Sequence, residues 1–117
     1  MTGEPIRAAL LLEQCWHRVP GGTAVAAVEL AGAMARRADV EVVGIAASHR
    51  GEPGIAPPEG IEIAHLRLPR PLLYESWVRL GRPRVDRPCG DPDLVHATGG
   101  AVPATGAPLA ATIHDLA

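Results

Sequence analysis

The stretch RAALLLEQCWHRVPGGTAVAAVELAGAMARR, residues 7–37, decides the fold of this chain. Its first part, Arg7–Glu13, is almost wholly apolar, as expected of a strand buried on both faces of a parallel sheet. Residues 20–22, Pro-Gly-Gly, then break the chain. Thr23–Arg37 is rich in alanine and lacks proline, which predicts a helix that Thr23 can cap. A strand, a glycine turn and a helix in this order are typical of an α/β domain.

The rest of the chain alternates short strands with turn-rich connections. Four more strands are predicted at Val40–Ala46, Ile61–Leu68, Leu94–Ala97 and Ala110–His114, and a short helix at Leu72–Leu80. A single long helix is too little to cover both faces of a doubly wound sheet. The fold class predicted is therefore α/β, with a Rossmann-like, mainly parallel sheet in an incomplete domain whose apolar faces are partly exposed.

Composition narrows the function classes. The chain has 117 residues, 47% hydrophobic and 21% charged, which fits one globular domain. All eleven basic residues are arginine, which excludes chemistry that needs a lysine amine. A net charge of −2 gives no basic field for nucleic acid, so no nucleic-acid partner is expected. No apolar run is long enough to span a bilayer and no signal peptide is recognisable, so a cytoplasmic location is expected. Cys15 and Cys89 are expected to be free thiols.

Three segments are expected to meet at the carboxyl edge of the sheet, where open parallel sheets bind their ligands. The start of the first helix offers glycines and unpaired N–H groups to an anion. A tight turn that needs a positive φ and histidines packed in the core remain the structural alternatives. No metal is expected, because the further ligands that such a site requires are not apparent. The candidate cleft residues are Gly21, Gly22, Thr23, His96, Thr98, Gly99, His114 and Asp115.

Residues 67–87 are strongly basic, with six arginines against Glu75 and Asp86. Arg67, Arg70 and Arg79 could meet a phosphorylated acceptor or an anionic membrane surface, which would place the protein peripherally at the inner face of the membrane. The alternative is a solvated surface in a chain that uses no lysine.

The order of these motifs resembles GT-B glycosyltransferases of family 4, and several stretches resemble actinobacterial-type members. The likeness covers nearly the whole chain and begins with a strand that ends at Glu13, then Trp16 and the Pro-Gly-Gly turn. The later matching stretches are LPRPLLYESW at 68–77, DLVHAT at 93–98 and TIHDLA at 112–117.

The resemblance implies a retaining transferase that moves a hexosyl group from a nucleoside diphosphate sugar to an acceptor. It implies that residues 1–117 form the amino-terminal, acceptor-side domain, truncated and without the carboxy-terminal nucleotide-sugar domain. Gly21 and Gly22 would face the donor phosphates, and His114 would reach the transferred sugar. No catalytic acid, base or nucleophile is carried over, and no cofactor is implied beyond the donor substrate. The chain alone is expected to bind nucleotide sugar weakly or not at all and to transfer nothing.

Two other readings stay open. The chain could be a non-enzymatic α/β module, or a subunit completed by a separate chain that supplies the missing half. A small Rossmann-type nucleotide binder is less favoured. The second strand is followed by Ala47, Ser48 and His49, with no acidic residue to bind a ribose.

Overall fold

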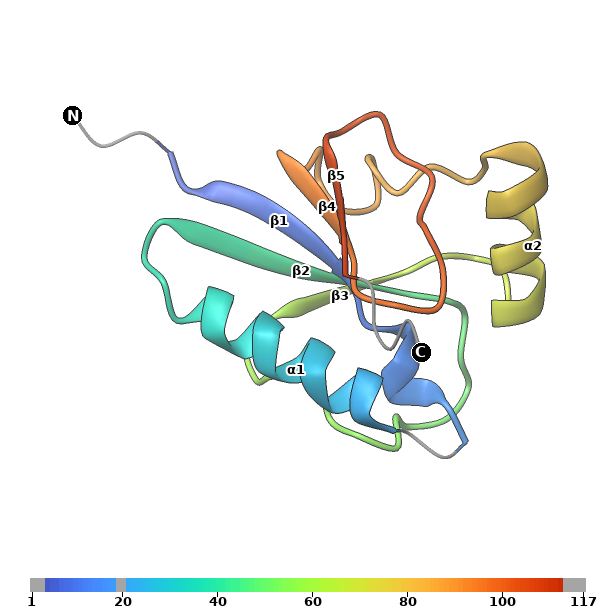
Figure 1. Cartoon of the computed structure of the whole chain (residues 1–117), viewed down its shortest axis with the longest axis horizontal. Coiled ribbons are helices and arrows are strands. Elements are labelled where there is room, and N and C mark those ends of the chain that lie inside the picture. Colours follow the sequence, from blue (N-terminus) through green and yellow to red (C-terminus); the bar gives the residue numbers. More distant parts are fainter. Residues whose placement is uncertain (1–3, 19–20, 113–117) are drawn as a thin grey trace.

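The computed structural model describes residues 4–18 and 21–112. Five parallel strands form one sheet in the order β3-β2-β1-β4-β5 (Figure 1). The predicted α/β fold with a Rossmann-like parallel sheet is confirmed. In chain order the elements are β1 (Ile6–Leu11), the 3-10 turn η1 (Glu13–Trp16), α1 (Gly22–Ala35), β2 (Val40–Ala46), β3 (Glu62–His65), α2 (Arg70–Leu80), β4 (Leu94–Ala97) and β5 (Leu109–Ala111).

The direction of winding reverses at β1. The chain proceeds from β1 outward through β2 to β3, and then returns to place β4 on the other side of β1. Leu10 accordingly lies beside Gly44 of β2 and beside His96 of β4. The carboxyl ends of β1 and β4 therefore flank a topological switch point, the position at which open α/β sheets bind ligands.

Side chains of β1 alternate between two separate hydrophobic cores, because successive residues of a strand point to opposite faces. Ala8 and Leu10 pack with α1, whereas Ala9 and Leu11 pack on the face that α2 covers. Both faces of β1 are buried, which explains its unbroken apolar sequence. Cys15 belongs to the α1 core and Cys89 to the α2 core, so the two free thiols lie on opposite faces.

Several predicted boundaries were wrong for identifiable reasons. β1 ends at Leu11, because the chain turns into η1 before Glu13. α1 begins at Gly22 with Gly21 as its N-cap, so the Thr23 side chain does not cap it. α2 begins at Arg70, two residues earlier than predicted, and accommodates a proline in its first turn. β5 covers Leu109–Ala111, so it ends before Thr112, and residues 113–114 of the predicted strand lie outside the described residues.

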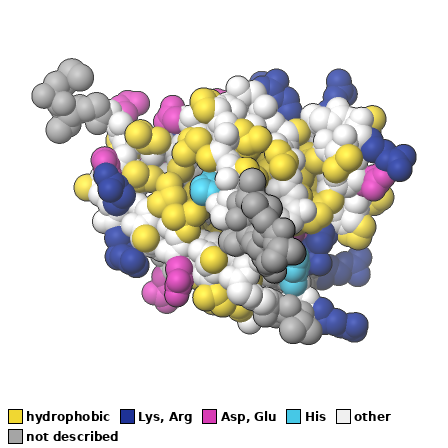
Figure 2. Space-filling model, in the orientation of Figure 1, with side chains coloured by type: hydrophobic (Ala, Val, Ile, Leu, Met, Phe, Trp, Pro, Cys, Tyr) yellow, Lys and Arg dark blue, Asp and Glu magenta, His cyan; other side chains and the backbone are white. Residues whose placement is uncertain are grey.

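The α1 face of β4 and β5 is not covered by the part of the chain that the structure describes. The α1 core contains no residue of either strand. His96 and Ala110, which are paired across β4 and β5, both remain partly exposed. Hydrophobic side chains are visible at the surface between α1 and the edge of the sheet formed by β4 and β5 (Figure 2). The opposite face of β4 is better covered, because Val95 and Ala97 are buried there and Ala101, Ala104 and Ala107 of the β4–β5 connection pack against the α2 core.

Near the amino ends of the strands, Arg7 links β1 to β2 and to the connection that precedes β4. Its Nε donates to the carbonyl of Cys89 at 2.6 Å, and its Nη1 pairs with Glu41 at 3.1 Å. Gly90 has a φ of +73°, and a Cβ at that position would lie 2.9 Å from Arg7 Nε. Gly60 has a similar φ of +83°, but a Cβ there would meet nothing within 4 Å.

These two glycines allow a matched test of the Arg7 contact. Both Gly60→Ala and Gly90→Ala should lose about 1–2 kcal/mol of unfolding free energy, because an L-residue is strained at positive φ. Gly90→Ala should lose about 1 kcal/mol more, since Arg7 must give up hydrogen bonds. Urea denaturation measures both losses. Equal losses would contradict a structural role for the Arg7 contact.

Candidate functional site

A fully buried carboxylate lies beside the end of β1. The Glu13 side chain is 0% exposed, and its Oε1 accepts a hydrogen bond of 2.8 Å from the backbone N–H of Ala47. His49 Nε2 lies 2.8 Å from Oε1 and 2.9 Å from Oε2. Arg70 Nε donates to Oε2 at 2.6 Å. This Glu13 cluster (Glu13, Ala47, His49, Arg70) therefore joins the ends of β1 and β2 to the first residue of α2.

Aromatic rings extend the cluster toward the surface. The indole of Trp16 stacks on His49 with ring centroids 5.0 Å apart, and His65 meets it edge-on at 5.4 Å. Trp16 Nε1 donates to the carbonyl of Gly51, and His65 Nδ1 donates to that of Ala47. The rings thereby hold the connection after β2 against the carboxyl end of the sheet.

The residue after Glu13 reaches in the other direction, toward β4. Gln14 is 2% exposed, and its Nε2 donates to Thr98 Oγ1 at 2.8 Å and to the carbonyl of Gly99 at 3.2 Å. Thr98 Oγ1 in turn donates to the carbonyl of Leu11 at 2.5 Å. These bonds bridge the switch point between β1 and β4, so the walls of the candidate crevice are fixed to each other.

Two buried polar atoms near this bridge have no hydrogen-bond partner within residues 4–18 and 21–112: Gln14 Oε1 and Tyr74 Oη. A Cβ on Gly100 would lie 3.8 Å from Tyr74 Oη, so this hydroxyl lies close to the turn that follows β4. Burial, with a smaller contribution from the charge of Glu13, raises the pKa of Tyr74 well above its usual range. Tyr74 is therefore a neutral hydroxyl, and an unsatisfied buried group of this kind costs about 1–3 kcal/mol.

The start of α1 presents unblocked backbone. Gly21 has a φ of −112°, and Gly22 adopts helical geometry. A Cβ on either glycine would meet nothing within 4 Å. The alternative that this turn merely needs positive φ is therefore wrong. Among the described residues, no side chain hydrogen-bonds to the first turn as a cap. The Ala24 N–H donates to the Gly21 carbonyl, so the N–H groups of Gly22 and Thr23 are the ones that this terminus offers to an anion.

Some predicted cleft residues come together and others do not. Thr98 and Thr112 line a hollow of about 150 Å³ with Ala26, Ala27 and Leu30, so the residues that follow β4 and β5 lie near the middle of α1. His96 is on the uncovered α1 face, where its Nε2 lies 2.6 Å from Thr112 Oγ1. His114 and Asp115 lie outside the described residues.

The three predicted arginines occupy different environments. Arg70 binds the buried Glu13, and Arg79 pairs with Glu75 one turn earlier on α2. Arg67 is exposed beside a pocket after β3. They therefore do not form a single anion-binding cluster.

Glu13, Gln14 and Tyr74 were not predicted as site components, and Arg70 was not predicted as the partner of a buried carboxylate. The signal for the first two was present, because polar residues directly after a wholly apolar strand mark its carboxyl end. Their partners are 34 to 85 residues away in the chain, and no local pattern identifies them.

Within the described residues, no group of three or more His, Cys, Asp or Glu could hold a metal ion. No helix in the same residues is long and apolar enough to cross a bilayer. Comparisons with protein-family models, with curated proteins and with solved structures found no match to this chain.

The Glu13 cluster makes a direct prediction about stability. Glu13→Gln removes the negative charge that faces Arg70 and His49, and breaking a buried ion pair on one side should cost about 3 kcal/mol of unfolding free energy. Glu75→Gln removes the same charge from an exposed pair on α2 and should cost less than about 0.5 kcal/mol. Urea denaturation compares the two variants. A loss for Glu13→Gln as small as that for Glu75→Gln would show that the cluster does not hold these elements together.

The histidines predict a pH dependence. Burial lowers the pKa of His96 below its ordinary 6.5, and burial followed by the charge of Arg70 lowers that of His17. The unfolded chain then binds protons at a higher pH than the native one, so stability should fall as the pH drops below about 6.5. His96→Gln should make this fall shallower, as measured by unfolding free energy between pH 7.5 and pH 5. Parallel curves for parent and variant would contradict a role for His96.

Proposed function

We propose that this chain is the amino-terminal, acceptor-side domain of a retaining GT-B glycosyltransferase of family 4. The enzyme would transfer a hexosyl group from a nucleoside diphosphate sugar to an acceptor. The positions of the motifs support this proposal. The glycine turn stands at the start of α1, and the stretch 93–98 ends at the switch point. This is the part of an α/β sheet where a nucleotide ligand binds.

The observation that carries the proposal is that the fold does not require glycine at residues 21 and 22. Neither residue has positive φ, and neither lacks room for a side chain. At Gly22, which lies inside α1, glycine also destabilises the helix relative to alanine, whereas Gly21 is the N-cap, where glycine is tolerated. A close approach of ligand to the backbone accounts for two adjacent glycines at this point, as it does in other phosphate-binding turns.

The chemistry at this turn suits a diphosphate. The free N–H groups and the positive end of the α1 dipole attract negative charge. In a transferase, the same groups would stabilise the charge that develops on the departing diphosphate. Gln14 and Thr98 would hold the opposite wall of the crevice in position through their bond across the switch point.

The alternative is a non-enzymatic α/β module, or a subunit completed by a separate chain. The uncovered α1 face of β4 and β5 favours this second candidate, because an apolar sheet face is normally covered by a further element. Under this alternative, substitutions at the glycine turn should not affect nucleotide-sugar binding.

Gly22→Ala tests the proposal through two opposite effects. The variant should gain about 0.5–1 kcal/mol of unfolding free energy, because alanine is favoured over glycine in a helix. The parent should bind UDP-glucose or GDP-mannose with an affinity in the millimolar range. The variant should bind either at least about 10-fold more weakly, because the new methyl group blocks approach to the backbone. Calorimetric titration measures binding, and denaturation measures stability.

Gly51→Ala is the matched control, because a Cβ there also meets nothing within 4 Å and the residue lies in the connection after β2. It should leave nucleotide-sugar affinity unchanged. The proposed function is contradicted if Gly22→Ala binds a nucleotide sugar as tightly as the parent chain does.

A further inference from the structure

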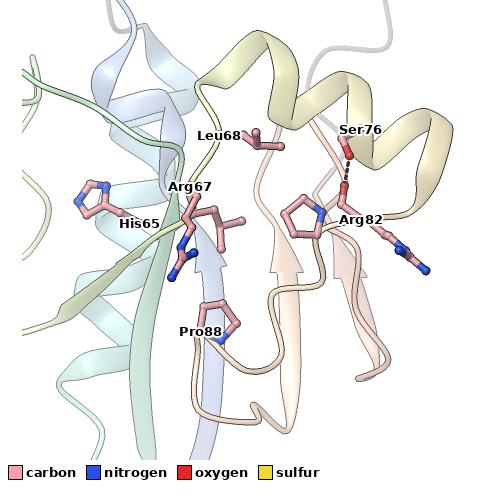
Figure 3. A pocket seen from close by; sticks show the side chains of 8 residues that line it. His65, Arg67, Leu68, Ser76, Arg82 and Pro88 are labelled. Carbon is pink, nitrogen blue, oxygen red and sulfur yellow. Dashed lines mark hydrogen bonds between the residues drawn. The ribbon is translucent and has the colours of Figure 1, made fainter.

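A second pocket lies on the face of the sheet that α2 covers, away from the switch point (Figure 3). Its volume is about 400 Å³, which is within the range of pockets that hold drug-sized molecules. One wall is the segment that follows β3, a second is α2, and the third is the connection from residue 82 to residue 88. Nothing in the proposed glycosyl transfer uses this pocket.

The interior of the pocket is apolar. Leu66, Leu68, Pro83 and Pro88 form most of its lining. The hydroxyl of Ser76 is already engaged, because it donates to the backbone carbonyl of Arg82 at 2.5 Å (Figure 3). A ligand would therefore gain mainly from the burial of apolar surface, at about 25 cal/mol per Å².

The rim of the pocket is positively charged. Arg67 and Arg82 line it and Arg87 precedes Pro88, and all three side chains are exposed. None of the three makes an ion pair with a described residue. The acidic residues Glu62 and Asp86 form ion pairs with other arginines, Glu62 with Arg7 and Asp86 with Arg84.

The close view distinguishes the roles of these arginines. In Figure 3 the Arg67 side chain extends beside the pocket toward Pro88, whereas the guanidinium of Arg82 points away from Arg67. Arg67 is thus the cation placed to contact a ligand in the pocket. Arg82 and Arg87 contribute only a positive field at the rim.

We propose that this pocket binds a small amphipathic anion. An apolar body would fill the space between the leucines and prolines, and a single phosphate or carboxylate group would pair with Arg67. A guanidinium suits both anions, since its planar array of donors can bind two oxygens at once. The site is independent of the glycine turn and of the transferase proposal.

Decyl phosphate, used below its micelle concentration, is a suitable probe. Calorimetry should show one saturable site on the parent chain. Decanol and butyl phosphate should each bind at least about 10-fold more weakly, because one lacks the charge and the other lacks most of the apolar body. Binding should weaken with added salt, as expected for a partly exposed ion pair.

Variants of exposed arginines test the assignment without threatening the fold. Arg67→Gln should weaken decyl phosphate binding about 10-fold, and Arg67→Glu should weaken it further through repulsion. Arg50→Gln removes the same charge from an exposed arginine outside the pocket and should leave the affinity unchanged. Trp77 fluorescence gives a second readout, since its Nε1 donates to the carbonyl of Pro83 in the pocket wall.

A further arm separates a free anion from a lipid headgroup. Phosphatidylglycerol vesicles that bind the chain and are displaced by decyl phosphate would support the pocket with a bilayer lipid as its source. Binding to vesicles without binding to soluble decyl phosphate would overturn the proposal in favour of surface docking. An affinity for decyl phosphate that is unchanged in Arg67→Gln, or that butyl phosphate matches, would also overturn it.

Discussion

The carboxylate of Glu13 is fully buried, and it lies where β1, the residues after β2 and the start of α2 meet. A buried charge is tolerated only when it is paired and hydrogen-bonded, and this one meets an N–H group, an imidazole and a guanidinium. Because Arg70 opens α2 and Ala47 follows β2, the position of α2 and the exit of the chain from β2 are set together. The α2 core and the pocket beside β3 depend on the same arrangement.

Gln14 links the end of β1 to the residues after β4, as Glu13 links it to the residue after β2. The two residues are consecutive, yet they bind on opposite sides of β1, because the 3-10 turn directs their side chains apart. The switch point is thus spanned by hydrogen bonds before any ligand enters, while the start of α1 remains uncapped. An exposed helix terminus that begins with two glycines beside a rigid switch point is a suitable environment for a diphosphate.

The sequence predicted the layers of the fold better than its site. The apolar run located β1, because burial on both faces leaves an unbroken apolar sequence, whereas β3 was located by its alternation of apolar and polar residues. The Pro-Gly-Gly turn correctly marked the start of α1. The partners of Glu13 and Gln14 could not be predicted, since they depend on which strands become neighbours. The environments of Arg67 and Arg70 could not be separated either, because both belong to one basic stretch. The pocket beside β3 depends on the path of residues 82–88, which as a sequence indicates only a proline-rich connection.

We propose that the ligand binds at the switch point, between the start of α1 and the end of β4. A titration of the isotope-labelled chain with a nucleoside diphosphate sugar, followed by backbone amide NMR, tests it most directly. The largest shift changes should fall on the amides of Gly21, Gly22, Thr23 and Gly99. Shift changes that gather around the pocket beside β3 and spare these four amides would contradict this location of the site.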